Sequence, residues 1–313
     1  MTKLHISPTP HIHEAGSSTR RIMLDVIIAL LPAAVAGIII FGLGALWTIL
    51  VCIASAVLAE FLFNLIARKE QTVGDLSAVV TGLLLALNLS TNVPLPECAL
   101  GSVFAMVVVK GFFGGIGKNL VNPAIAARVF LLLAFTSKVA GGANPVGVEL
   151  TSSATPLVTI NQGAEAAKAI SLGDLFLGNY GGAIGETCTI ALLIGFVYLV
   201  VRRVIKWYVP VAFVGTVFVL AFLFGGFDVL YALRYILAGG LLLGAIFMAT
   251  DYVTTPATGL GRIIFCVGAG ILTYLIRRFG GYPEGVSIAI LSMNLLTPFI
   301  SDLTKKKTLG GVK

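Results

Sequence analysis

Near the N-terminus, residues Ile22 to Phe41 read IMLDVIIALLPAAVAGIIIF, an apolar run in which Asp25 is the one charged side chain. A helix of roughly 20 apolar residues crosses a hydrocarbon core about 30 Å thick. The run is too long for the core of a signal peptide, and it has no small-residue cleavage site. We therefore predict a permanent membrane span here, which sets the class of the whole chain.

The composition supports the same class. Hydrophobic residues make up 58% of the chain and charged residues 11%, and the mean hydropathy is +1.01, whereas soluble domains carry roughly 25% charged residues. We predict an all-α polytopic membrane protein with about ten transmembrane segments. They are Ile22 to Phe41, Ala45 to Ala67, Asp75 to Leu89, Cys98 to Phe112, Asn119 to Phe135, Gly182 to Val201, Tyr208 to Phe224, Val229 to Ala249, Gly261 to Ile276, and Val286 to Ile300.

The positive charges indicate the orientation of these segments, because cytoplasmic loops hold the excess of Lys and Arg. With both termini cytoplasmic, fifteen of the 21 basic side chains fall inside and five outside, while Arg128 lies within a span. The outside pair Arg277-Arg278 is the exception and predicts a short, tilted or half-spanning ninth segment. The net charge of +7 then reflects topology and contact with anionic lipid, with no need for a nucleic-acid partner.

This topology divides the chain into five regions. They are a cytoplasmic N-terminal segment (1–21), a first membrane repeat (22–135), an extracytoplasmic loop (136–181), a second membrane repeat (182–300) and a basic cytoplasmic tail (301–313). The loop is unusually long for a compact helical protein, which suggests a function or a docking surface.

The two membrane regions resemble each other in sequence. The matching features are Leu85 to Leu89 with Met248 to Tyr252, Pro94 with Pro256, Phe113-Gly114-Gly115 with Phe279-Gly280-Gly281, and Asn122-Pro123 with Thr297-Pro298. Five spans per half would place the copies in opposite orientations, and inverted repeats of this kind hold a site near the membrane midplane. Chance similarity among small apolar residues remains the alternative.

Two familiar kinds of site are not indicated. The four cysteines, Cys52, Cys98, Cys188 and Cys266, are far apart and lack a Cys-x-x-Cys pair, so neither a metal centre nor a disulfide framework is predicted. The run from Gly114 to Asn119 is glycine-rich, but it lacks the spacing and the Ser or Thr of a phosphate-binding loop. We interpret it as a tight cytoplasmic turn.

Polar residues just after this turn are candidates for ligand contacts. A helix beginning at Asn119 would place Asn119 and Asn122 on one face, where their amides suit a planar heterocycle. Arg128 would lie within the membrane, where a charge is usually functional or paired. Pairing with Glu60, Asp25 or Asp251 and contact with a ligand both remain open.

Asp251 is a candidate for ion binding. It precedes Thr254-Thr255-Pro256, which would break the helix and release carbonyl oxygens. A carboxylate, hydroxyls and carbonyls suit a hard cation such as sodium, or a proton path. Solvation of a helix end at the interface is the alternative.

The region 136–181 contains a hydroxyl-rich stretch, Thr151-Ser152-Ser153-Ala154-Thr155-Pro156. Hydroxyl side chains closed by a proline predict a turn or an exposed loop. Thr155 has no neighbouring His or carboxylate base that would make it a catalytic nucleophile. A hydroxyl that only caps the turn is the simplest interpretation from these residues alone.

In order along the chain, Gly114 to Ala124, Arg128, Ser152 to Leu157 and Ala249-Thr250-Asp251 resemble the NqrB/RnfD family, whose members belong to the Rnf ferredoxin:NAD oxidoreductase and to the sodium-pumping NADH:quinone reductase. The resemblance covers nearly the whole chain and is strongest to the Rnf members. It implies about ten helices in two inverted five-helix repeats, similar to urea transporters.

The most specific part of the resemblance is an attachment motif for flavin. In the family, an acidic residue, two spacers, Ser or Thr, usually Gly, then Ala and Ser or Thr mark the acceptor of a flavin transferase. Glu149, Ser152, Ser153, Ala154 and Thr155 fit this spacing, with Glu149 where Asp is usual and Ser153 where Gly is usual. The resemblance implies FMN joined covalently to Thr155 through a phosphoester, on an accessible extracytoplasmic segment.

The resemblance also implies the function. The chain would be a flavin-carrying subunit of a redox-driven ion pump in a bacterial cell membrane, relaying electrons between the ferredoxin and NAD sides and coupling them to sodium or proton translocation. Partners would be the other Rnf subunits, including a second flavin-bearing one, the flavin transferase and membrane lipid.

The resemblance further implies a second, non-covalent flavin (riboflavin or FMN) at Asn119, Asn122 and Arg128, and it makes Asp251 a candidate on the ion path. No catalytic residue is assigned, because the complete enzyme would be the complex. The alternatives are a channel or secondary transporter with inverted repeats and no redox role, and a scaffold whose neighbours hold the flavins.

Overall fold

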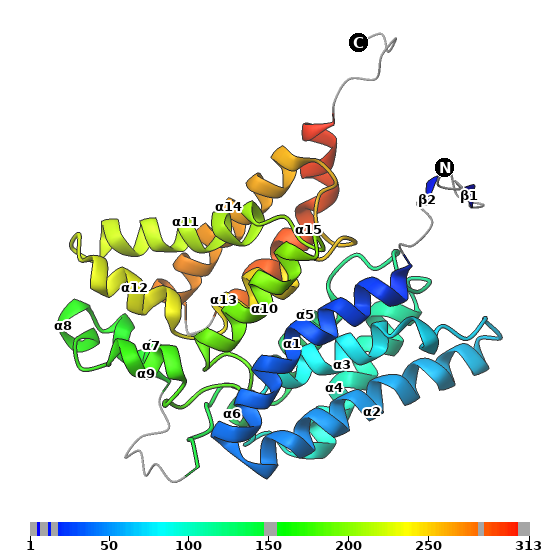
Figure 1. Ribbon diagram of the computed structural model, residues 1–313, viewed down its shortest axis with the longest axis horizontal. Helices are drawn as coiled ribbons and strands as arrows, with labels where there is room; N and C mark the ends of the chain where they lie inside the picture. The colour runs from blue at the N-terminus through cyan, green and yellow to red at the C-terminus, as the bar shows by residue number, and fades with distance from the viewer. Residues whose placement is uncertain (1–4, 7–11, 14–17, 147–154, 281–284, 306–313) are drawn as a thin grey trace.

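The computed structural model describes residues 5–6, 12–13, 18–146, 155–280 and 285–305 (Figure 1). Their regular elements are helices, apart from an antiparallel pair of two-residue strands, β1 (His5–Ile6) and β2 (Ile12–His13). Within the described ranges, four helices are long and apolar enough to cross a membrane: α1 (Thr19–Phe41), α2 (Leu43–Ile66), α14 (Gly259–Phe279) and α15 (Val286–Thr304). The predicted class, an all-helical polytopic membrane protein, is confirmed.

Each of the ten predicted segments contains a helix, but several helices are shorter than a span. Four are apolar helices of 10–17 residues: α3 (Ser77–Leu87), α5 (Pro123–Ala134), α10 (Thr189–Val201) and α11 (Tyr208–Phe224). In the fourth segment, α4 (Leu95–Phe104) continues into the π-helix η2 (Ala105–Gly111). Asn88 follows the last residue of α3, and Asn122 caps the first turn of α5.

The eighth segment is broken. Helix α12 (Val229–Leu237) is followed at 69° by α13 (Leu241–Leu243) and the π-helix η3 (Gly244–Met248). The bend lies at Ala238, Gly239 and Gly240, and Gly239 adopts a φ of 71°, which glycine tolerates best. The predicted segment Val229 to Ala249 is therefore made of two helical pieces that meet at a bend.

The ninth segment corrects a second expectation. Helix α14 is 21 residues long and uninterrupted, so the prediction of a short or half-spanning segment is wrong. Arg277 is buried, and its guanidinium donates to the carbonyl oxygens of Tyr235 at 2.9 Å and Ala238 at 3.2 Å. These carbonyls lie at the end of α12, where the break leaves them without backbone partners. Arg277 is therefore a basic residue on the predicted outer side because it donates hydrogen bonds to a helix end inside the protein.

The two membrane regions repeat the same order of helix packing. Helix α2 packs on α3 and α4, and α11 packs on α12 and α14. Across the molecule α1 packs on α10 and α5 on α15, so corresponding helices meet (Figure 1). One part of the predicted parallel is wrong, because Asn122-Pro123 begins α5 whereas Pro298 lies inside α15.

Very small residues make the closest of these contacts. A Cβ on Gly195 of α10 would lie 2.3 Å from the carbonyl oxygen of Ala29 in α1, and one on Gly82 of α3 would lie 2.7 Å from the carbonyl oxygen of Cys52 in α2. Membrane helices associate through such close backbone approach. The glycines therefore fix the pairing within and between the halves.

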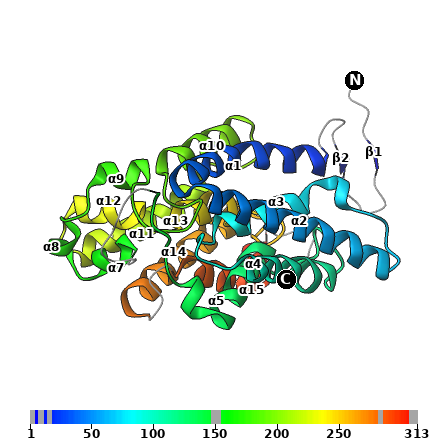
Figure 2. The same cartoon turned by 90° about the horizontal axis from the view of Figure 1, so that it is seen from below.

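The region 136–181 holds short helices where the sequence predicted a loop. They are α6 (Thr136–Val139), α7 (Pro156–Asn161), α8 (Ala164–Ala167) and α9 (Leu172–Leu177). Figure 2 shows α7, α8 and α9 beside α12 at the end of the molecule away from the start of α1. The short 3-10 helix η1 (Val73–Asp75) joins α2 to α3.

Candidate functional site

A cavity lies between the two halves, and we call it the central cavity. Its walls come from α1, α3 and the residues before α5 on one side, and from the end of α10, η3 and the residues after η3 on the other. Its polar lining residues are Ser77, Thr81, Lys110, Asn119, Asn122, Thr250 and Asp251. The structure thus brings together three residues that the sequence singled out separately: Asn119, Asn122 and Asp251.

Asp251 is held in this cavity by neutral donors. Its Oδ1 accepts from the backbone N–H of Val253 at 3.2 Å, and its Oδ2 accepts from Thr254 Oγ1 at 3.2 Å and from Asn122 Nδ2 at 3.5 Å. Among the residues that the structure describes, no Lys or Arg forms an ion pair with it. The carboxylate therefore brings negative charge to the cavity without a basic partner from these residues.

The carbonyl oxygens near Asp251 are already used. The carbonyl of Thr254 accepts from Thr297 Oγ1 at 2.8 Å, and that of Pro256 accepts from Arg262 Nε at 3.0 Å. Each of these two carbonyl oxygens thus already accepts one hydrogen bond, from Thr297 and Arg262 respectively. The carboxylate of Asp251 lines the central cavity beside them.

Asn119 and Asn122 do not share a helix face as predicted, because α5 begins at Pro123 and both precede it. The Oδ1 atom of Asn122 accepts from the backbone N–H groups of Ala124 at 3.0 Å and Ile125 at 3.3 Å, so the residue caps α5. The Oδ1 atom of Asn119 is buried with no hydrogen-bond partner among the described residues. Asn119 is therefore the better placed of the two to bind a ligand in the cavity.

Arg128 lies elsewhere. It is buried in α5 but is not among the residues that line the central cavity, and it interacts electrostatically with the buried Glu186. The three predicted partners are engaged with other groups: Asp25 with Arg202 at 3.2 Å, Glu60 with Lys110 at 2.6 Å, and Asp251 with Asn122 and Thr254. The predicted pairings of Arg128 are therefore wrong.

Two charged residues of note were missed in the sequence. Glu186 is buried, accepts from the backbone N–H of Ala183 at 2.9 Å and interacts electrostatically with both Arg128 and Arg277. Lys110 was counted among the cytoplasmic charges although it lies within the predicted fourth span. A charge inside an apolar run is the signal that would have revealed it.

Thr155 is the first described residue after 147–154, so Glu149, Ser152, Ser153 and Ala154 of the predicted motif lie outside the described residues. Thr155 immediately precedes α7, but its side chain does not cap that helix. It is 8% exposed, and its Oγ1 is buried without a hydrogen-bond partner in the described part of the chain. The expected accessibility of this hydroxyl is therefore wrong for the conformation seen here.

The fold and the cavity define a class of protein, an all-helical polytopic membrane protein whose two helical groups enclose a polar cavity. A family model for NQR2, RnfD and RnfE proteins matches residues 5–310, and the chain belongs to this family.

Curated relatives match over nearly their whole length, and each is the D component of its complex. The chain is 44% identical to that of the Na(+)-translocating ferredoxin:NAD(+) oxidoreductase complex of Acetobacterium woodii, over 99% of this chain and 96% of that protein. It is 40% identical to that of the proton-translocating ferredoxin:NAD(+) oxidoreductase complex of Clostridium ljungdahlii, over 97% and 96%. It is 37% identical to that of the ion-translocating oxidoreductase complex of Stutzerimonas stutzeri, over 94% and 93%.

Proposed function

We propose that this chain is a flavin-carrying membrane subunit of a redox-driven ion pump, which relays electrons between the ferredoxin and NAD sides of a complex and couples them to translocation of sodium or protons. The relatives carry names of this kind, as subunits of ion-translocating ferredoxin:NAD oxidoreductases. The flavin would supply the redox chemistry when bound, and the chain its position and electrostatics.

The observation that carries the proposal is the buried Oγ1 of Thr155, which has no hydrogen-bond partner among the described residues. A buried hydroxyl left without a partner costs about 1–3 kcal/mol. Esterification by the phosphate of FMN would replace the hydroxyl hydrogen and so remove the unsatisfied donor. The residue fits the attachment, provided that the segment opens for the transferase before it packs.

The central cavity is the proposed place of a second, non-covalent flavin, riboflavin or FMN. The unpartnered Oδ1 of Asn119 is an acceptor that suits a ring N–H. Asn122 would contribute less, because its amide caps α5 and contacts Asp251. Arg128 lies away from this cavity, so the proposal for this flavin rests on the two asparagines.

Asp251 is the proposed ion-binding group in the same cavity. Its carboxylate lacks a basic partner among the described residues, so a sodium ion or a proton could balance its charge. The relatives from Acetobacterium woodii and Clostridium ljungdahlii are named for sodium and for protons respectively, so membership of the family leaves the ion open.

In the proposed topology both termini are cytoplasmic and Thr155 faces the outside of a bacterial cell membrane, where a flavin transferase would act. The other subunits of the complex and membrane lipid would be its partners.

Flavin fluorescence of the denatured chain tests the proposal. The protein is produced in a host that makes the transferase, and the denaturing gel is viewed under ultraviolet light. We expect a fluorescent band from the natural chain and from Thr159→Ala, a matched control one turn further along α7, and no fluorescence from Thr155→Ala. A dark band from the natural chain would contradict the covalent flavin and favour a channel or transporter.

A further inference from the structure

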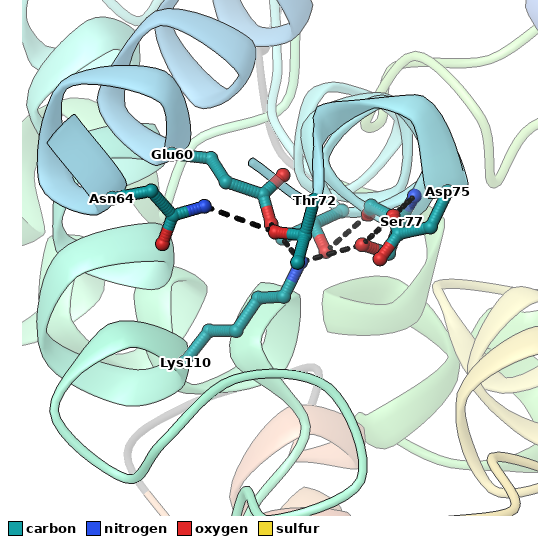
Figure 3. A network of polar contacts seen from close by, with 7 residues as sticks. Glu60, Asn64, Thr72, Asp75, Ser77 and Lys110 are labelled. Atoms are coloured by element: carbon teal, nitrogen blue, oxygen red, sulfur yellow. Dashed lines mark hydrogen bonds and ion pairs between the residues drawn. The ribbon is translucent and has the colours of Figure 1, made fainter. Parts of the chain in front are cut away.

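A buried ion pair joins α2 to the π-helix η2. Lys110 Nζ lies 2.6 Å from Glu60 Oε1, and both side chains are 5% exposed. Figure 3 shows the Lys110 side chain rising between α2 and the start of α3, with its ammonium group between Glu60 and Ser77. Burying two charges is costly and is often replaceable by apolar packing, so stability alone does not explain the pair.

Hydrogen bonds extend from the pair toward the surface. Thr72 Oγ1 donates to Glu60 Oε1 at 2.7 Å and accepts from Asn64 Nδ2 at 3.0 Å, and Thr72 is exposed. On the other side Lys110 donates to Ser77 Oγ, which donates to the half-exposed Asp75 (Figure 3). The pair is therefore the buried centre of a polar chain that reaches the surface.

The pair also stands between two cavities. Lys110 and Ser77 line the central cavity that contains Asp251. Lys110 also lines a second cavity, bounded by Glu60, Thr72 and the glycine-rich turn at Gly114 and Gly115, which we call the turn cavity. The Lys110 side chain is therefore shared by both cavities.

Glu60 has an unused acceptor. Its Oε2 is buried and has no hydrogen-bond partner among the described residues. This oxygen is therefore free to accept a hydrogen bond from a group or a water molecule in the adjoining cavity. The π-helix that carries Lys110 is a further indication, because π-bulges occur frequently at functional sites.

We propose that Glu60 and Lys110 form a proton-transfer gate between the turn cavity and the central cavity. The Lys110 ammonium gives a proton to water in the central cavity, Glu60 takes a proton from water in the turn cavity, and this proton then passes from the Glu60 carboxyl to the Lys110 amine. The original ion pair is restored and one proton has crossed. The other charged groups around the pair are Lys69 and Glu70 in the turn cavity, Asp75 beside Ser77, and Asp251 in the central cavity.

This inference rests on the proposed function, since electron transfer in the complex would drive the protons. The test uses the whole complex in sealed vesicles, with a pH-sensitive dye reporting protons moved per electron and with electron-transfer turnover measured in parallel. In Lys110→Arg the positive charge remains but cannot be released, because the guanidinium stays protonated.

We expect Lys110→Arg to reduce proton movement about 100-fold, the contribution typical of a positioned proton-transfer group, while turnover without a membrane potential is retained. Glu60→Gln is expected to behave the same way and carries the test if Lys110→Arg fails to assemble. Lys138→Arg, in the more exposed pair with Glu97, is the matched control and should be unaffected.

Natural proton movement in Lys110→Arg or Glu60→Gln would overturn the gate. Sodium movement without proton movement in the natural complex would also overturn it, while leaving the proposed function intact. Electron transfer that moves no ion of either kind in the natural complex would instead overturn the proposed function.

Discussion

The two halves of the chain each bring a π-helix to the central cavity, and they differ in how the charge beside it is held. In the first half, η2 carries Lys110, which is paired with Glu60 of the same half. In the second half, η3 ends three residues before Asp251, whose partners among the described residues are hydroxyl, amide and backbone N–H groups. The charge in the first half is therefore balanced within that half, whereas Asp251 has no Lys or Arg partner among the described residues.

The halves also differ in how their interrupted helices end. After α3, the carbonyls of Leu87 and Leu89 accept from the backbone N–H groups of Gly185 at 2.8 Å and Ile184 at 3.0 Å. At the break of α12, the carbonyls of Tyr235 and Ala238 accept instead from the guanidinium of Arg277. Related folds of the two halves are thus stabilised by a backbone contact in one and by a buried charge in the other.

Breaking the pair in the first half should have the largest effect. Lys110→Met leaves Glu60 buried without its cation, and we expect a loss of about 3–5 kcal/mol in the free energy of unfolding. The measurement is the thermal denaturation of the detergent-solubilised protein, followed by the yield of assembled complex.

The double variant Lys110→Met with Glu60→Gln removes both charges and should recover most of that loss. Lys138→Met, which breaks the more exposed pair with Glu97, should cost no more than about 1 kcal/mol. Equal losses in Lys110→Met and Lys138→Met would show that burial does not distinguish the two pairs.

Removing the charge that ends α12 should come next. Arg277→Met leaves the carbonyls of Tyr235 and Ala238 without these donors, and we expect a loss of about 2–4 kcal/mol in unfolding free energy. Arg278→Met is the matched control, since the neighbouring Arg278 is exposed and donates to the carbonyl of Asn161 at 3.1 Å. If the two variants denature at the same temperature, the structural role of Arg277 is refuted.

Arg277 and Arg278 illustrate which features of the fold could be predicted from the sequence. Hydropathy located a helix in all ten segments, because membrane burial requires long apolar runs. It could not locate the break at Gly239, where Arg277 from a distant helix bonds the carbonyls of Tyr235 and Ala238. The distribution of Lys and Arg marked Arg277-Arg278 as an exception, because the pair lies on the predicted extracytoplasmic side. The sequence alone does not distinguish an arginine that bonds a distant helix end from one in a loop.

The candidate site was predictable to a similar degree. Asn119, Asn122 and Asp251 were identified as polar groups out of place in apolar sequence, and they do line one cavity. Their contacts were not predictable, because Asn122 caps α5 and Asp251 lies 129 residues away in the chain. Arg128 was grouped with the asparagines by proximity in sequence, whereas the helix carries it away toward Glu186.

The unpaired charge of the second half predicts a functional effect of intermediate size. Asp251→Asn removes the charge but keeps the shape, and the loss of one charge-assisted contact of about 2 kcal/mol corresponds to roughly 30-fold weaker cation binding. The measurement is the cation concentration that gives half-maximal ion-coupled turnover, with flavin content unchanged. Asp302→Asn, at the exposed end of α15, is the control, and unaltered coupling in Asp251→Asn would remove this residue from the ion path.

The smallest expected effect concerns the helix caps of the two halves. Asn122 caps α5 and Asp228 caps α12, each by accepting from two backbone N–H groups. Replacement of either by alanine should cost about 1 kcal/mol in unfolding free energy, the usual loss of an N-cap.

The two caps should differ in function, because only Asn122 also contacts Asp251. Asn122→Ser keeps a capping oxygen but is too short to hold the carboxylate, so we expect near-natural stability together with altered cation dependence of turnover. Asp228→Ser should leave both unchanged. If Asn122→Ser also leaves the cation dependence unchanged, the contact between Asn122 and Asp251 is structural only. Any effect of the charges beside the two π-helices on ion coupling would then come from the pair of Lys110 and Glu60 alone.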